Sequence, residues 1–206
     1  MLTKGDDFPI HQKPSPLAEV GSSRNFYDRY FFNGYSHEDE IFFGAVLCVY
    51  PNLNIMDAAF TIAHKGIQHN VRASRILNLE RLDTVVGPIQ VKVIEPLQKL
   101  QVLVNDKDSG INVDITFDGF TEVLQEPQMY LYDGPRKTMD TCRMVQHGSW
   151  TGQIKLENLK IDINQEKFVG TRDRSWGVRP VGAYDSQDRK STRLNSSHRC
   201  ISYAVF

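Results

Sequence analysis

The stretch KLQVLVNDKDSGINVDITFDGF, residues 99–120, contains two runs in which apolar and polar side chains alternate. A period of two residues places every second side chain on the same face, which is typical of a half-buried β-strand. Between the runs lies NDKDSG, residues 105–110, a cluster of turn-forming residues that predicts a hairpin with a loop longer than two residues. The apolar positions of the two runs are Leu100, Val102, Val104, Ile111, Val113, Ile115 and Phe117.

The same period extends to other parts of the chain. It is present in residues 87–96 and 150–158, and residues 159–164 are expected to return beside the latter after a turn. Helical spacing is confined to residues 74–83, where one or two helical turns are expected. Strands in such close succession predict an all-β, antiparallel barrel or sandwich. Aromatic and β-branched runs predict further strands at 25–35, 40–51, 56–66 and 67–77.

The composition is that of an ordinary globular domain. The chain has 206 residues, of which 40% are hydrophobic and 24% charged, enough for one large all-β domain. A net charge of -1 argues against nucleic acid as a partner. No apolar run approaches the roughly 20 residues of a membrane helix. The N-terminus lacks the apolar core of a signal peptide, which predicts a cytoplasmic location.

Several classes of site lack support in the sequence. The three cysteines, Cys48, Cys142 and Cys200, have no paired spacing, so reduced thiols are expected. His64 and His69 flank a turn, but a metal usually needs at least three protein donors and no third is signalled. The sequence therefore predicts no metal site. None of the common nucleotide-binding, serine-hydrolase or zinc-protease motifs is present.

The segment GTRDRSWGVRP, residues 170–180, carries more ionisable side chains than a plain core strand. In an extended chain Arg172, Arg174 and Trp176 share one face, while Asp173 and Ser175 share the other. An unpaired buried carboxylate would be very costly, so an inward Asp173 would need a guanidinium partner. Two interpretations stay open: a polar cluster at the floor or rim of a barrel cavity, or a structural lock that closes the barrel.

Three more residues are candidates for the same site. Trp150 has a large apolar body and one N–H donor, which suits the wall of an apolar cavity and equally suits a core. His147 lies three positions before it, and Arg179 lies near the end of the charged segment. Asp173 is the catalytic candidate. The ligand-binding candidates are His147, Trp150, Arg172, Arg174, Trp176 and Arg179.

Residues 170–179 resemble the signature G-x-R-D-H-S-W-G-x-R of a lipocalin-like superfamily. That superfamily includes the hydroxyneurosporene synthases (carotenoid hydratases), the AttH-type proteins and related bacterial proteins. Residues 49–74 and 81–104 are similar to the N-terminal half of such relatives, and the resemblance spans about residues 24–184. Arg174 stands where relatives often have His, which puts an imidazole acid or base at that position in doubt.

The resemblance implies a lipocalin-like fold with two tandem barrels and no organic cofactor. We expect the protein to bind an apolar small molecule such as an isoprenoid, a lipid or a polyketide. The alternative is an enzyme that hydrates, cyclises or isomerises such a ligand, with Asp173 as the proton donor if an apolar cavity raises its pKa. The neighbouring arginines argue against a protonated Asp173. A second alternative is a structural or interaction module whose barrel is filled by its own side chains.

The chain divides into four expected parts. Residues 1–24 form a polar leader or arm, and residues 25–169 form the first barrel or sandwich. Residues 170–187 form a junction motif and the start of a second domain. Residues 188–206, DRKSTRLNSSHRCISYAVF, resemble the translation of a common short-read sequencing adapter. The sequence therefore predicts a non-native tail and, as a missing partner, the C-terminal domain of the same chain.

Overall fold

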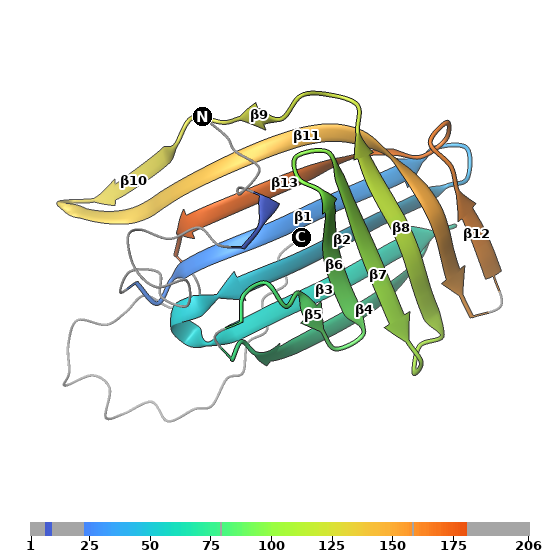
Figure 1. Cartoon of the computed structure of the whole chain (residues 1–206), viewed down its shortest axis with the longest axis horizontal. Helices are drawn as coiled ribbons and strands as arrows, with labels where there is room; N and C mark the ends of the chain where they lie inside the picture. The colour runs from blue at the N-terminus through green and yellow to red at the C-terminus, as the bar shows by residue number, and fades with distance from the viewer. Residues whose placement is uncertain (1–6, 10–22, 79, 158, 181–206) are drawn as a thin grey trace.

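The alternating runs form a single, strongly curved antiparallel sheet in the computed structural model (Figure 1). The structure describes residues 7–9, 23–78, 80–157 and 159–180. A 3-10 turn, Pro51–Leu53, lies between two of the strands. The strands are β1 (Phe26–Ser36), β2 (Ile41–Tyr50), β3 (Ile55–His64), β4 (Ile67–Ile76), β5 (Val85–Val86), β6 (Ile89–Glu95), β7 (Lys99–Asp106), β8 (Ile111–Gly119), β9 (Leu124–Gln125), β10 (Met129–Asp133), β11 (Arg136–Leu156), β12 (Leu159–Ile163) and β13 (Val169–Val178).

The last strand joins the two halves of the sheet. The order β4-β3-β2-β1-β13-β11-β8-β7-β6-β5 places β13 between the N-terminal meander and the second group of strands. The charged segment that begins at Gly170 is therefore a central strand of the barrel. The division into two domains stays a prediction. The tail at 188–206 lies outside the described residues.

The barrel is nearly closed where β4 meets β5. Arg75 donates hydrogen bonds from its guanidinium to the backbone of the segment before β6, including one of 2.6 Å from Nε to the carbonyl oxygen of Val85. Gly87 lies so close to Ala73 that a Cβ at Gly87 would be 2.8 Å from the Ala73 methyl. Side-chain hydrogen bonds and tight packing thus replace a regular strand pairing at this seam. The fold is an antiparallel, lipocalin-like barrel, which confirms the predicted class.

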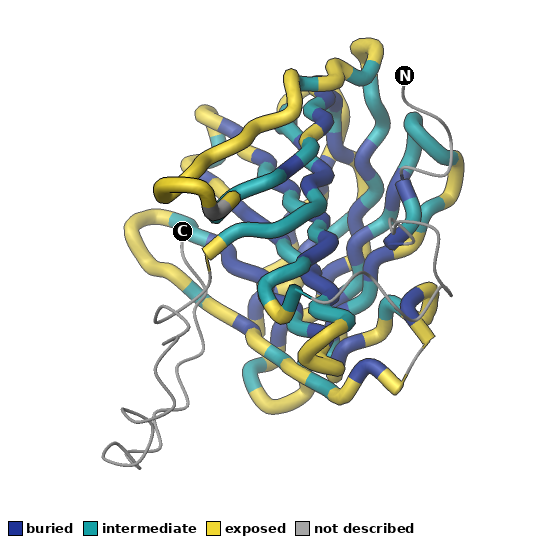
Figure 2. The backbone as a smooth tube through the Cα atoms, turned by 90° about the vertical axis from the view of Figure 1, so that its left-hand side faces the viewer, coloured by how far each residue is buried: buried dark blue, intermediate teal, exposed yellow. Residues whose placement is uncertain are grey.

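The predicted hairpin is present, and the apolar positions of its two strands face each other in the observed register. Val102 pairs with Ile115 and Val104 with Val113, so the apolar faces of β7 and β8 point to the same side. These residues belong to one continuous buried core that runs through the barrel. Figure 2 shows the resulting pattern, with buried segments along the strands and exposed ones at the turns. The helical turns expected at 74–83 are absent from the described residues, because β4 extends to Ile76 and a turn follows it.

Four glycines lie side by side across the middle of the barrel. Gly34 on β1 pairs with Gly170 on β13, which pairs with Gly148 on β11, which pairs with Gly119 on β8. All four take inward-facing positions of their strands, so this glycine row leaves a trough in the inner wall. At Gly148 the long strand β11 pairs with β13 on one side and with β8 on the other. Figure 1 shows that β11 is strongly curved.

Aromatic rings fill the trough. A Cβ on Gly34 would overlap the Phe43 ring, and a Cβ on Gly148 would overlap the Phe117 ring. Trp150 packs edge-on against both rings, with centroids 5.2 Å and 5.3 Å away. Its indole N–H donates a 2.9 Å hydrogen bond to the backbone carbonyl of Asn33, so the buried donor is satisfied. Trp150 is a core residue of the barrel.

We predict that Gly170→Ala destabilises the protein by about 1–3 kcal/mol or more, because the new methyl overlaps Asn33 and lies 2.7 Å from the Trp150 indole nitrogen. Denaturant unfolding followed by tryptophan fluorescence measures the change. Gly44→Ala is the matched control, since its methyl would meet nothing closer than 3.5 Å. Equal stability of the two variants would contradict the role given to the glycine row.

Candidate functional site

The inward face becomes polar immediately beyond the glycine row. Because β1, β13 and β11 are in register, their inward side chains form successive rows towards one end of the barrel. The charged and polar side chains there are buried and contact one another, and we call them the inner polar cluster. Its members are Asp7, Asp28, Tyr30, Arg81, Gln146, Arg172 and Arg174. The rows run from Phe32–Arg172–Gln146 through Tyr30–Arg174–Met144 to Asp28–Trp176–Cys142.

Arg174 is the centre of one half of the cluster. Its Nη2 atom lies 2.7 Å from the Asp28 carboxylate, and its guanidinium stacks 4.0 Å from the centroid of the Tyr30 ring. Burial lowers the pKa of Arg174, but Asp28, Tyr30 and Asp7 together outweigh burial and the pKa is raised. Arg81, from the segment between β4 and β5, contacts the other oxygen of Asp28 at 3.3 Å. Asp28 is thus an acceptor for two guanidinium groups.

Arg172 is the centre of the other half. Its Nε atom donates a 2.7 Å hydrogen bond to the side-chain oxygen of Gln146. The Gln146 amide in turn donates to the backbone carbonyls of Leu97 and Thr121, at 3.0 Å and 2.8 Å. The two terminal nitrogens of Arg172 both contact the carboxylate of Asp7. The barrel itself therefore fixes the orientation of the guanidinium, and Asp7 completes its contacts.

Tyr30 is a hydrogen-bond donor between the two halves. Its hydroxyl donates to the backbone carbonyl of Asp7. Burial is the main cause that raises the pKa of Tyr30 far above its usual value, although Arg174 lowers it in part. The phenol consequently stays neutral at any physiological pH, and its single proton is donated to the carbonyl of Asp7.

The structure separates the predicted site residues into two groups. Arg172 and Arg174 point into the barrel, and the register places Trp176 on the same side. Asp173 lies on the opposite face of β13, where it contacts Arg29 at 3.4 Å. Burial raises the pKa of Asp173, against the lowering effect of the nearby arginines. The carboxyl pKa thus shifts in the direction that a proton donor requires, but outside the barrel interior.

The remaining two candidates also lie outside the cluster. His147 is on the outer side of β11, where its Nδ1 atom is 3.3 Å from the Thr171 hydroxyl. The guanidinium of Arg179 stacks on the Tyr27 ring at 4.2 Å. Within the described residues, neither side chain forms a hydrogen bond or ion pair with the inner polar cluster. Arg172 and Arg174 share one face of β13, as strand periodicity predicts, but the sequence did not identify their carboxylate partners.

Asp28 was detectable in the sequence, whereas Asp7 was not. In NFYDRYFFNGY, residues 25–35, Asp28 takes the same face as Tyr30, Phe32 and Gly34, and a charge on an aromatic face is the signal of a buried ion pair. Asp7 lies in a polar, proline-containing arm with no periodicity. Its contact with Arg172 spans 165 positions of sequence, and no local pattern indicates it.

A hollow of about 300 Å³ adjoins the inner polar cluster. Tyr30 lines the hollow and also belongs to the cluster, so the two are contiguous. The rest of the wall comes from the segment between β4 and β5, from β6 and from the described N-terminal segment, which Figure 1 draws in dark blue. These other lining residues are Phe8, Pro9, Leu82, Thr84, Gln90, Val91, Lys92 and Val93.

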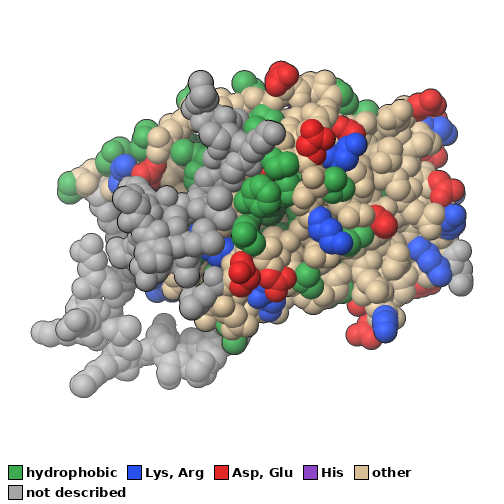
Figure 3. Space-filling view, in the orientation of Figure 1, with side chains coloured by type: hydrophobic (Ala, Val, Ile, Leu, Met, Phe, Trp, Pro, Cys, Tyr) green, Lys and Arg blue, Asp and Glu red, His purple; other side chains and the backbone are tan. Residues whose placement is uncertain are grey.

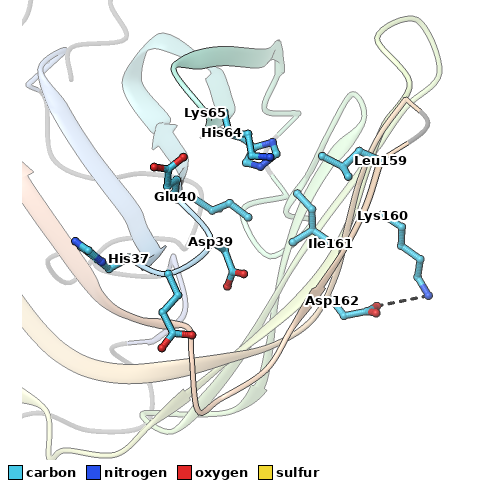
Figure 4. A pocket seen from close by; sticks show the side chains of 11 residues that line it. His37, Asp39, Glu40, His64, Lys65, Leu159, Lys160, Ile161 and Asp162 are labelled. Atoms are coloured by element: carbon cyan, nitrogen blue, oxygen red, sulfur yellow. Dashed lines mark ion pairs between the residues drawn. The ribbon is translucent and has the colours of Figure 1, made fainter.

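A larger and more open hollow, about 730 Å³, lies at the other end of the barrel. Figure 4 shows its wall, formed by the β1–β2 turn, the β3–β4 turn and β12. His37 and His64 both line it, but charged side chains of both signs surround them, including the ion pair of Lys160 with Asp162 at 3.5 Å. The described residues contain no cluster of three His, Cys, Asp or Glu side chains suited to a metal ion. This hollow is a wide, solvated mouth.

Cys48 and Cys142 are free thiols, as the sequence predicts. Burial raises the pKa of the Cys48 thiol to about 12, which keeps it protonated. Cys200 lies outside the described residues. Among the residues that the structure describes, no helix is long and apolar enough to cross a membrane.

We predict a large and a small loss of stability for substitutions of two aspartates that lie on opposite faces of the sheet. Asp28→Asn should lower the free energy of unfolding by about 3–5 kcal/mol, because it removes the carboxylate between two buried guanidinium groups. Asp173→Asn should change it by less than about 1 kcal/mol at pH 7, because its partner Arg29 is partly exposed. Urea unfolding at neutral pH measures both.

The pH dependence of Asp173→Asn follows from the direction of the shift. The folded pKa of Asp173 is raised above its unfolded value, so the ionised carboxylate lowers stability at pH 7. That cost disappears as the pH falls through the folded pKa. The stability of the variant relative to the native chain should therefore be highest near neutral pH and decline in acid, and a constant difference would refute the raised folded pKa of Asp173.

We predict that Tyr30→Phe flattens the loss of stability in alkali. Above the ordinary value of 10.0 the unfolded phenol ionises while the buried Tyr30 does not, so native stability falls as the pH rises. The variant loses this contribution, although Tyr50 and Cys48, whose pKa values are also raised by burial, still contribute. Urea midpoints from about pH 8 to about pH 11 measure the slope, and equal slopes would contradict a buried, neutral Tyr30.

Comparisons with known proteins agree with the fold. Kievitone hydratase from Nectria haematococca superposes with a TM-score of 0.56 at 16% identity, over 72% of this chain and 47% of that one. CghA superposes with a TM-score of 0.51 at 12% identity, over 82% and 52%. CghA with Sch210972 gives 0.50 at 11%, over 75% and 46%. The chain thus spans about half the length of these structures, and at such identities the likeness shows the fold alone.

The sequence comparison shows the family. No curated protein matches the chain. The model of the family of unknown function DUF8625 matches residues 2–204, a range that includes the segment resembling an adapter. Because the match covers nearly the whole chain, the protein belongs to the DUF8625 family.

Proposed function

We propose that the barrel binds an apolar small molecule at the end that contains Tyr30. The observation that supports this most directly is the hollow of about 300 Å³ that adjoins the inner polar cluster. Its wall includes the apolar side chains of Leu82, Val91 and Val93, and Tyr30 supplies a polar group at its inner side. Small-molecule sites commonly have this composition, with mostly apolar walls and a few placed polar groups.

The middle of the barrel is unsuitable for a ligand. Trp150, Phe43 and Phe117 occupy the space above the glycine row, and the apolar core continues through the barrel. A ligand enclosed at the centre would have to displace well-packed rings, which is costly. The proposed site is therefore at the end of the barrel that contains Tyr30, with the inner polar cluster as its floor.

The alternative proposal is a cofactor-independent hydratase, cyclase or isomerase. One structure of similar fold is named a hydratase, and another contains the compound Sch210972. Tyr30 would donate a hydrogen bond to a substrate oxygen, and Arg172 and Arg174 would stabilise negative charge that develops there. Such groups suit reactions that pass through an enolate. They do not suit protonation of an isolated double bond, because Asp28 is held as an acceptor by two guanidinium groups.

Under the carotenoid-hydratase alternative, Asp173 is the local candidate for the acid role. Its side chain lies across β13 from the hollow, so Asp173 would act only on a molecule bound to the outer face of the sheet. We therefore assign the proposed ligand contacts to the inner polar cluster, and Asp173 stays a candidate acid for the outer face.

The proposed partner of this barrel is a second barrel of the same chain. The strand β10 carries exposed apolar side chains at Met129, Tyr130, Leu131 and Tyr132. Figure 3 shows hydrophobic side chains gathered at the upper left edge, where Figure 1 places β10. An exposed apolar edge of this kind is typical of a surface that another domain covers. We also propose that the whole protein is located in the cytoplasm.

We predict that the neutral dye N-phenyl-1-naphthylamine binds to the full chain in the hollow. Leu82→Lys should weaken this binding about fivefold, equivalent to roughly 1 kcal/mol of lost apolar contact. Fluorescence titration measures the affinity. The dye is neutral, so it reports on the apolar wall without engaging the arginines.

Leu124→Lys is the matched control, because Leu124 is an exposed leucine on β9, outside the wall of the hollow. Dye affinity should be unchanged in this variant. If the native chain binds no dye, or if both variants lose it equally, the filled-barrel alternative replaces the proposal. Native mass spectrometry of the purified chain would in addition detect an apolar molecule retained from the host.

A further inference from the structure

We infer that Arg172 and its neighbours form a carboxylate-binding subsite, and that the carboxylate of Asp7 now occupies it in place of a ligand. The inference rests on the proposed function, because it identifies the head group of the molecule whose apolar part would occupy the hollow. The ligand class is an organic acid with an apolar body.

The donors of the subsite converge on one carboxylate. Arg172 offers two terminal nitrogens, the paired geometry that guanidinium groups use for carboxylates. The backbone N–H of Leu97 donates to one of the same Asp7 oxygens. Asp7 is completely buried, so these contacts form away from water. Three donors in a desolvated position are a strong receptor for a planar anion.

The receptor is built by the barrel and does not depend on Asp7. Gln146 holds the Nε atom of Arg172 at 2.7 Å, and Phe117 lies beneath the guanidinium at 5.8 Å. Gln146 is itself fixed by the carbonyl oxygens of Leu97 and Thr121. Asp7, by contrast, precedes the first strand and belongs to no element of the sheet. A host that is organised independently of its guest can accept another guest of the same chemistry.

The same segment of chain also satisfies two other donors with carbonyl oxygens. The hydroxyl of Tyr30 donates to the carbonyl of Asp7, and Arg174 donates to the carbonyl of Phe8 at 2.9 Å. The occupant is thus one carboxylate followed by two carbonyl oxygens. An acid that carries an oxygen substituent near its carboxyl group would reproduce this pattern.

The position of the hollow determines where the rest of the ligand would lie. Phe8 and Pro9, which follow Asp7, line the hollow together with Leu82, Val91 and Val93. When residues 7–9 leave, the carboxylate subsite and the hollow become one continuous space. The carboxylate of the ligand then takes the place of the Asp7 side chain, and its apolar body lies over Leu82. Asp7 is accordingly a competitor of the ligand.

The test compares cis-parinaric acid with its methyl ester, two fluorescent probes that share one apolar body and differ in the carboxylate. Asp7→Ala in the full chain should bind the acid about tenfold more tightly than the native chain does, because the subsite is no longer occupied. The affinity for the ester should change by less than about twofold, since the ester lacks the charge that Arg172 recognises.

A second substitution assigns the effect to Arg172. In the Asp7→Ala background, Arg172→Met should abolish the preference for the acid and leave ester binding in place. Arg143→Met is the matched control, because Arg143 is an exposed arginine paired with Glu126. The preference for the acid should persist in that control. Asp7→Asn, which keeps the size of the side chain, serves as the opening variant if Asp7→Ala does not fold.

The outcomes separate this inference from the proposed function. If acid and ester gain affinity equally, Asp7 only obstructs the hollow and the carboxylate subsite is refuted. The subsite is also refuted if neither probe responds to Asp7→Ala or Asp7→Asn while the ester and N-phenyl-1-naphthylamine still bind, because Asp7 is then a structural lock. If no probe binds to any variant, the proposed function itself fails, and the inference fails with it.

Discussion

The glycine row sets the distance between the inner wall of the barrel and its aromatic core. Gly34, Gly170 and Gly148 leave no side chain where the rings of Phe43, Trp150 and Phe117 lie, and a methyl at any of the three would overlap a neighbour. Because the row crosses β1, β13 and β11, it also fixes the level at which these strands pair. The register of every inward residue towards the polar end follows from this level, since side chains alternate strictly along a strand.

The change from apolar to polar interior takes place along one strand. On β13 the successive inward residues are Gly170, Arg172 and Arg174, so two arginines follow directly after the core. Each guanidinium lies over an aromatic ring, Arg172 over Phe117 and Arg174 over Tyr30. The aromatic core therefore continues beneath the charges and supports them. This arrangement explains how the buried arginines keep a packed environment while their nitrogens face the end of the barrel that contains Tyr30.

The sequence predicts the barrel well and the site in part. Period-two patterns identified the β7–β8 hairpin and the inward face of residues 150–156, because local alternation is sufficient for a sheet with one buried side. The sequence could not show that the four glycines lie side by side, because they come from four strands and the pairing of strands depends on topology. The arginines of β13 were singled out by their density, whereas their partner Asp7 was missed, because a contact across 165 positions leaves no local pattern. The helical turns expected at 74–83 were wrong because β4 continues through the first part of that range.

Stability alone is a poor explanation for the inner polar cluster. Transfer of a guanidinium and a carboxylate from water to a protein interior costs several kcal/mol for each ion, and a well-packed apolar filling is often as stable or more stable. The barrel already contains such a filling around Trp150, so the same sheet could have continued it towards the mouth. Instead the charges occur where the core ends and a hollow begins, and one of the carboxylates is supplied by a segment outside the sheet. A lock built only for strength would be expected to use partners within the sheet, as Asp28 and Arg174 do. The pairing of Arg172 with Asp7 has the geometry of a receptor with a replaceable occupant, which is the property that distinguishes a binding site from a core.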